Sequence, residues 1–123
     1  MSIVSYEPPG FVGVVIYVEK RSENMMQARE VIYGLEEEGL PHTIISDGFH
    51  DDNTNGLAQQ AANKSVFDVG ICCSDNAIVL HQGNLPKENP VIQISKNQAN
   101  LNKARLLGIN AARLIKRMPF EEI

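Results

Sequence analysis

Apolar stretches alternate with amphipathic stretches along the chain, as in an α/β protein. Residues 12–18 are nearly all apolar and rich in β-branched side chains, as in a strand that is covered on both faces. From residue 22 to about residue 38 the apolar positions recur with helical spacing, and Gly39 and Pro41 follow as stop signals. The same patterns predict further strands at 42–46, 67–73, 77–81 and 91–95, and helices at 56–63 and 98–118.

The order of these elements predicts the fold class. Three residues separate the strands at 67–73 and 77–81, and two of them, Asp75 and Asn76, are a tight-turn signal, so these two strands should be antiparallel. We therefore expect a three-layer α/β/α sandwich with a mixed five-stranded sheet, mostly parallel with one antiparallel strand. Residues 1–123 should form one domain, with an irregular lead-in at 1–10.

The composition argues against several classes of function. Hydrophobic residues make up 43% of the chain and the formal net charge is −4, which is typical of a globular protein that does not bind nucleic acid. The apolar runs are shorter than the roughly 20 residues that cross a bilayer, and the first residues do not resemble a secretory signal. We expect no membrane partner and a cytoplasmic location. The adjacent Cys72 and Cys73 should be free thiols, a small buried residue and its neighbour.

The sequence contains no motif for catalysis or for independent nucleotide binding. Neither glycine-rich phosphate loop occurs, and no serine or cysteine elbow is present. Residues 51–56 resemble the start of a calcium loop, but Ala62 occupies the position of the bidentate glutamate. His81 could serve as a base only if the fold brought it to an acidic partner. We therefore expect a protein that is not an enzyme and has no cofactor-binding residues of its own.

The first helix has the surface feature that suggests a function. A helical projection places Met25, Ala28, Ile32 and Leu35 on the core face, and Glu30, Gly34 and Glu37 on the opposite face. A glycine inside a helix costs about 1 kcal/mol relative to alanine. On a solvent-facing stripe, Gly34 is either merely tolerated or allows close approach by another protein. Glu30 and Glu37 beside it would suit a basic partner or a shared metal ion. In the last helix, Gly108 should let the helix lie close to the sheet.

Four segments of the chain together resemble a known family. The segments are GLEEEGLP at 34–41, AANKS at 61–65 leading into VGI at 69–71, His81 with Leu85, Pro86 and Pro90, and LGINAARLIK at 107–116 with Pro119 and Phe120. In this order and spacing, from about residue 12 to residue 120, they resemble the small (beta) subunit of the reactivating factor for cobalamin-dependent diol and glycerol dehydratases.

The resemblance implies a chaperone-like role without catalysis. Such a subunit pairs with a large Hsp70-like ATPase subunit, and the complex releases damaged cobalamin from inactivated dehydratase. Exchange with the dehydratase's own medium subunit implies transient contact with the dehydratase large subunit. In this family the Gly-Leu-Glu-Glu segment meets the large ATPase subunit, and its second glutamate, here Glu37, helps to bind a divalent cation such as Mg²⁺.

The exact location of the protein and one alternative function stay open at this point. The protein would work in the cytoplasm, either free or in a bacterial microcompartment. The alternative function is that of a small α/β domain that binds cobalamin or a nucleotide fragment directly.

Overall fold

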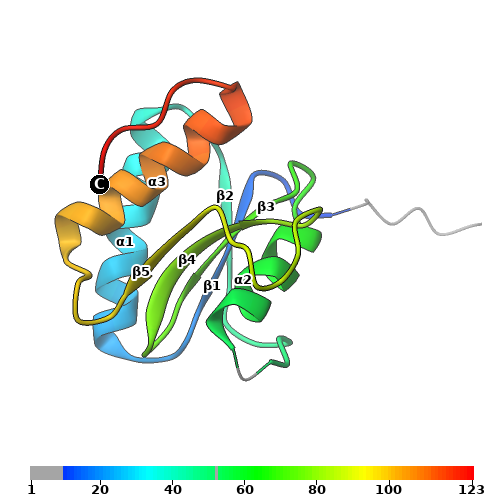
Figure 1. Cartoon of the computed structure of the whole chain (residues 1–123), viewed down its shortest axis with the longest axis vertical. Coiled ribbons are helices and arrows are strands. Elements are labelled where there is room, and N and C mark those ends of the chain that lie inside the picture. Colours follow the sequence, from blue (N-terminus) through cyan, green and yellow to red (C-terminus); the bar gives the residue numbers. More distant parts are fainter. Residues whose placement is uncertain (1–9, 52) are drawn as a thin grey trace, which may run out of the picture.

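Eight helices and strands follow one another in the computed structural model, which describes residues 10–51 and 53–123 (Figure 1). They are β1 (Val14–Val18), α1 (Ser22–Glu37), β2 (His42–Ile45), α2 (Thr54–Asn63), β3 (Val69–Cys73), β4 (Ala77–Gln82), β5 (Ile92–Ser95) and α3 (Leu101–Lys116). This order confirms the predicted one. The lead-in predicted for 1–10 lies outside the described residues except for Gly10.

The strands form one mixed sheet in the order β2-β1-β3-β4-β5. β1 pairs in parallel with β2 and β3, whereas β4 runs antiparallel to both β3 and β5. The backbone N–H of Ser74 donates to the carbonyl oxygen of Ala77 at 3.0 Å, which closes the tight turn between β3 and β4. β4 is therefore the one reversed strand, as the short connection predicts.

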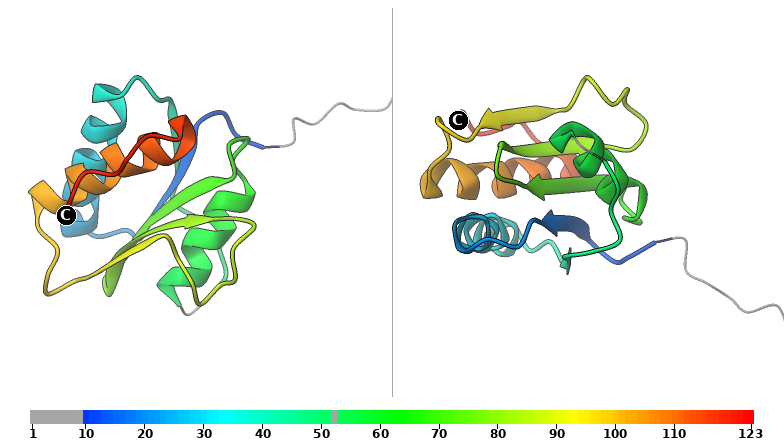
Figure 2. Two further views of the ribbon diagram at one scale, coloured as in Figure 1. Left: turned by 45° about the horizontal axis from the view of Figure 1, so that its top comes forward. Right: turned by 90° about the horizontal axis from the view of Figure 1, so that it is seen from below.

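The helices cover both faces of the sheet, with α1 and α3 on one face and α2 on the other (Figures 1 and 2). Successive residues of β1 alternate between the two cores, because side chains of a strand point to opposite faces. The core under α1 and α3 includes Ile16, Leu35, Ile71, Leu80 and Leu107, and the core under α2 includes Val15, Leu57, Ala58, Cys72 and Val79. These two cores confirm the three-layer α/β/α sandwich.

Asparagine side chains set the starts of the second and third helices. The side chain of Asn53 accepts a hydrogen bond from the backbone N–H of Asn55 at 2.7 Å. That of Asn100 accepts from the N–H of Lys103 at 2.8 Å. Such N-caps satisfy helix N–H groups that have no partner within the helix. α2 thus begins two residues before the predicted position, and α3 begins three residues after it.

The C-terminal segment, residues 117–123, folds back over α3 (Figures 1 and 2). The buried side chain of Asn110 donates to the carbonyl oxygen of Glu121 at 2.9 Å and accepts from its N–H at 2.7 Å. Arg113 adds a contact between its guanidinium and the Glu121 carboxylate at 3.2 Å. The segment therefore has a fixed path. Within the described residues, no helix combines the length and the apolar character needed to cross a membrane.

Candidate functional site

The first helix turns a different face to the core from the one that its sequence predicts. Ala28 and Leu35 are buried and Ile32 packs against the same core, as expected. Met25, however, is 47% exposed. The buried side of α1 also includes Asn24, Gln27, Val31 and Gly34. A projection that follows hydrophobicity alone assigns the polar members of this group to the outside.

Gly34 lies where α1 crosses α3, and not on an open surface. A Cβ atom on Gly34 would lie 2.2 Å from the carbonyl oxygen of Arg105 and 2.8 Å from the nitrogen of Ile109. A Cβ on Gly108 would lie 2.1 Å from the carbonyl oxygen of Val31. The prediction that Gly34 is exposed is therefore wrong, because its close neighbour is α3 of the same chain. Gly108 faces inward as predicted, but it brings α3 close to α1 and not to the sheet.

Glu37 and Glu30 do lie on the outer side of α1. The Glu37 side chain is 42% exposed, and its carboxylate forms an ion pair with Arg105 of α3. Glu30 is partly exposed. It precedes Glu37 by seven residues, so the two lie on nearly the same side of the helix, about 10 Å apart along its axis. The two predicted carboxylates are thus on the surface, without the glycine between them.

Among residues 10–51 and 53–123, no three histidine, cysteine, aspartate or glutamate side chains are grouped so that they could hold a metal ion. In the loop that resembles the start of a calcium site, Asp51 forms an ion pair with Lys87 at 2.8 Å and accepts from the N–H of Asn53 at 2.9 Å.

A polar cluster that no sequence motif indicates lies where β3 and β5 end beside α1. The ammonium group of Lys96 donates to the side-chain oxygens of Asn24 and Gln27, at 2.7 and 3.1 Å. Its third contact is the carbonyl oxygen of Ser74, at 3.4 Å. Asn24 donates in turn to Asp75 at 2.8 Å. An ammonium has three donors, so two of them tie α1 to the end of β5 and the third joins β5 to the turn after β3.

The candidate reactive side chains are buried. The ring nitrogens of His81 lie 2.8 Å from the carbonyl oxygen of Gln82 and 3.1 Å from that of Lys87. These contacts are with the backbone and not with an acidic partner, so they give His81 a structural role. Cys72 and Cys73 are both free, as predicted, and both are buried, where the sequence predicted one buried residue and its neighbour. Burial raises the pKa of both thiols, that of Cys73 to about 12, which leaves little reactive thiolate at neutral pH.

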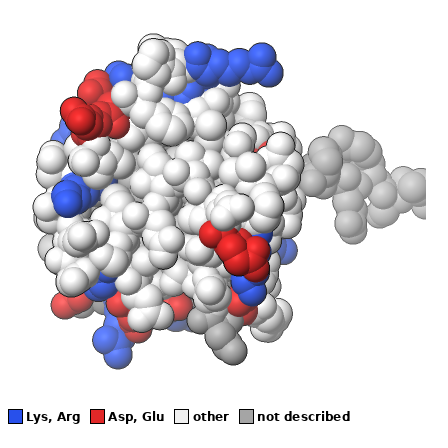
Figure 3. Space-filling view, viewed as in Figure 1, with Lys and Arg blue, Asp and Glu red and all other residues white. Residues whose placement is uncertain are grey.

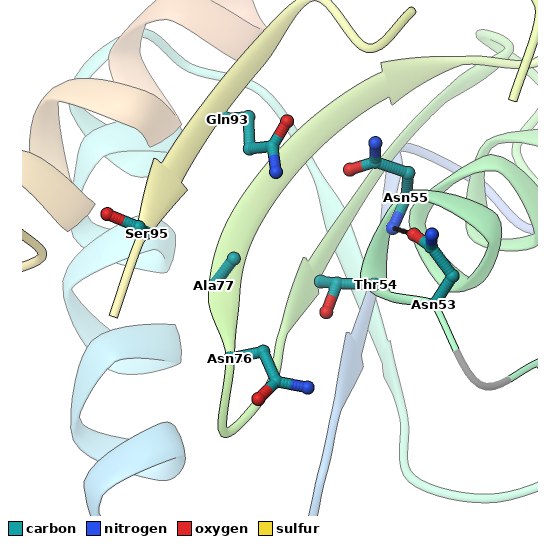
Figure 4. A pocket seen from close by; sticks show the side chains of 7 residues that line it. All are labelled: Asn53, Thr54, Asn55, Asn76, Ala77, Gln93 and Ser95. Carbon is teal, nitrogen blue, oxygen red and sulfur yellow. Dashed lines mark hydrogen bonds between the residues drawn. The ribbon is translucent and has the colours of Figure 1, made fainter. Parts of the chain in front are cut away.

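A polar pocket of about 250 Å³ lies between the start of α2 and the strands β4 and β5 (Figure 4). The described part of its lining contains four side-chain amides, two hydroxyls and no charged side chain. The lining residues are Asn53, Thr54, Asn55, Asn76, Ala77, Gln93 and Ser95. The side-chain oxygen of Asn55 is buried without a hydrogen-bond partner among the described residues. The pocket therefore suits an uncharged polar group that can donate a hydrogen bond.

The chain is similar to a set of known proteins over most of its length. Residues 13–121 match the family model described as dehydratase medium subunit. Over 93 residues the chain is 41% identical to a propanediol dehydratase-reactivating factor small subunit of Citrobacter freundii, an alignment that covers 76% of this chain and 78% of that protein. Over 112 residues it is 31% identical to a probable glycerol dehydratase-reactivating factor small subunit of the same organism, covering 90% and 94%.

Solved structures show the same similarity. A chain of a structure described as glycerol dehydratase reactivase superimposes with a TM-score of 0.78 at 31% identity, covering 94% of this chain and 98% of that chain. A chain of the diol dehydratase-reactivating factor complexed with ADP and Mg²⁺ superimposes with a TM-score of 0.75 at 30% identity, covering 94% and 100%.

Proposed function

The chain belongs to the dehydratase medium subunit family, as a small subunit of a diol or glycerol dehydratase-reactivating factor, and we propose that it acts as a chaperone-like partner without catalysis of its own. The name of its relatives implies a larger partner subunit. In this proposal the larger subunit is an Hsp70-like ATPase that supplies the energy. This chain supplies a docking surface, and both work in the cytoplasm, free or inside a bacterial microcompartment.

The proposed mechanism is exchange of subunits between two complexes. The family model that matches residues 13–121 is named for the medium subunit of the dehydratase, whereas the relatives are subunits of reactivating factors. Two proteins with the same fold can compete for the same binding site on a third protein. We propose that this chain leaves its large partner and takes the place of the medium subunit on the dehydratase large subunit. The displacement would open the enzyme and release damaged cobalamin.

Glu37 supports a contact with the larger subunit. Its carboxylate is half exposed, at the contact between α1 and α3, where Oε1 forms an ion pair with Arg105. A carboxylate can accept several interactions at once. The exposed carboxylate could therefore bind a Mg²⁺ ion as well, since Mg²⁺ commonly takes one or two carboxylates and fills its other positions with water or partner oxygens. The similar diol dehydratase-reactivating factor was solved with ADP and Mg²⁺.

Replacing Glu37 with glutamine should weaken binding to the large subunit at least about tenfold when Mg²⁺ is present. Glutamine keeps the size of the side chain but loses the charge that attracts the cation. Isothermal titration calorimetry with the purified large subunit, with Mg²⁺ and with EDTA, measures the effect.

Glu36→Gln is the matched control, because Glu36 is exposed on the neighbouring side of α1. Its affinity should stay close to that of the unmodified chain. Glu30→Gln tests the second predicted interface residue in the same titration. Equal affinities of the unmodified and Glu37→Gln chains in Mg²⁺ would remove this contact from the proposal.

The pocket beside α2 favours a second candidate function, the direct binding of cobalamin or of a nucleotide fragment. Its amide lining is suited to uncharged polar groups, as is the side-chain oxygen of Asn55, which has no hydrogen-bond partner in the described part of the chain. A titration of the isolated chain with cobalamin, followed by the visible spectrum, separates the two functions. The docking function predicts no spectral change up to about 100 µM, whereas a Kd in the low micromolar range would favour direct binding.

A further inference from the structure

β5 forms one edge of the sheet, and no strand of the described chain pairs with its outer side. Figure 1 looks onto this edge, with β5 in front of β4, and the right view of Figure 2 shows β5 as the outermost strand. We propose that β5 pairs antiparallel with β5 of a second copy of this chain. The two sheets would then continue into one another about a two-fold axis.

The first observation behind this proposal is the absence of charge at the edge. Natural edge strands are commonly protected by charged side chains that keep other strands away. From residue 89 to residue 102, Lys96 is the only charged residue, and its ammonium turns inward to Asn24 and Gln27. Figure 3, viewed as in Figure 1, shows a broad uncharged area in the middle of this face, with charged side chains mostly around it.

This uncharged edge suits a second copy in particular. Each molecule has a formal net charge of −4, so two copies repel one another over most orientations. At the β5 edge they can meet without placing like charges opposite each other. A two-fold pairing also requires a surface that is complementary to itself, and the backbone and side chains of β5 meet that requirement.

The backbone of β5 determines which of its groups face outward. The N–H of Lys96 donates to the carbonyl oxygen of Asn76 at 2.9 Å, and hydrogen-bonded pairs in an antiparallel ladder recur at every second residue. Ile94 and Ile92 therefore direct their backbone groups toward β4, opposite Ile78 and Leu80. Gln93 directs its N–H and carbonyl group outward. With Gln93 opposite Gln93 of the second copy, each N–H can donate to the other's carbonyl oxygen.

The same register also matches the side chains. Ile92 comes opposite Ile94 of the second copy, and both belong to the core side under α1 and α3. The exposed Gln93 side chains meet on the α2 side, where amides can bond to one another.

Disulfide formation tests the register directly. Opposed residues of a hydrogen-bonded antiparallel pair have Cα atoms about 5.5 Å apart, and a disulfide spans about 4.4–6.8 Å. We expect the full chain with Gln93→Cys to form a covalent dimer under mild oxidation at least about tenfold faster than Ser46→Cys. Ser46 is exposed just after β2, at the opposite edge of the sheet. The unmodified chain gives the background, because its own thiols are buried.

A second experiment measures the oligomeric state of the chain and its variants by sedimentation equilibrium. At about 100 µM, where an interface with a Kd of about 10 µM is mostly occupied, the unmodified chain should be a dimer. Gln93→Lys should be a monomer, because it places two ammonium groups at the two-fold axis. Ser46→Lys changes the net charge equally and should stay a dimer. Circular dichroism checks that each variant is folded.

Three results would overturn the proposal. One is a monomeric unmodified chain at about 500 µM, far above the Kd expected for a functional dimer. Another is cross-linking of Gln93→Cys no faster than that of Ser46→Cys. The third is a monomeric chain whose Gln93→Lys variant loses affinity for the large subunit, which would assign this edge to that partner.

Discussion

Replacing Gly34 with leucine should destabilise the fold by about 3 kcal/mol or more, a large part of the roughly 5–15 kcal/mol that stabilises a typical domain. The first side-chain atom alone would lie 2.2 Å from the carbonyl oxygen of Arg105. That oxygen belongs to the backbone of α3, so it cannot move aside as a flexible side chain can. The two helices would have to separate and open the core beneath them. Urea unfolding of the isolated chain measures the loss.

The Gly34→Ala variant tests whether a side chain at position 34 stabilises or destabilises the fold. At an exposed helix position, alanine stabilises by about 1 kcal/mol relative to glycine, whereas at this crossing it should destabilise. Tyr33→Leu is the control, because Tyr33 is the exposed neighbour on the same helix, and its effect should stay within about 0.5 kcal/mol. A more stable Gly34→Ala chain would contradict the crossing described here and would return Gly34 to the surface.

Replacing Lys96 with methionine should destabilise the fold by about 2 kcal/mol, because each buried polar group left without a partner costs roughly 1–3 kcal/mol. The side-chain oxygens of Asn24 and Gln27 are both buried and both accept from this ammonium. Methionine is of similar length but cannot donate. Since Lys96 is itself partly exposed, water can replace some of the lost bonds, which keeps the expected cost below the sum for two orphaned acceptors.

Lys20→Met is the matched control for Lys96→Met. Lys20 is exposed just after β1, so the same change of charge and shape there should alter the unfolding free energy by less than about 0.5 kcal/mol. The two midpoints are compared in the same urea titration. Equal stabilities of the two variants would show that the ammonium of Lys96 does not hold α1 to the sheet.

The fold could be predicted because its signals are local. The apolar run of β1, the stop signals Gly39 and Pro41 after α1, and the tight turn at Asp75 are each read from a few neighbouring residues. The turn alone decides that β4 is antiparallel. The first residues of α2 and α3 were predicted less accurately, because the caps Asn53 and Asn100 set these starts and the apolar spacing alone does not reveal them.

The orientation of α1 could not be predicted in the same way. Asn24 and Gln27 count as surface residues in a hydrophobic projection, yet they are buried because Lys96, some seventy residues later, reaches them. Met25 is exposed in their place. This rotation carries Gly34 from the expected surface to the contact with α3. The predicted exposure of Glu37 does not depend on this rotation, because Glu37 lies on the outer side of α1 in either orientation.

The way in which Asn110 holds the end of the chain has a consequence for how freely that end can vary. Its two hydrogen bonds are made with the backbone of Glu121 and not with the side chain. Any residue type except proline at position 121 can therefore keep both bonds, so most substitutions there should cost only the contact with Arg113 and leave the path of the tail unchanged. A change at Asn110 has no such tolerance, because nothing in the tail can supply an amide in its place.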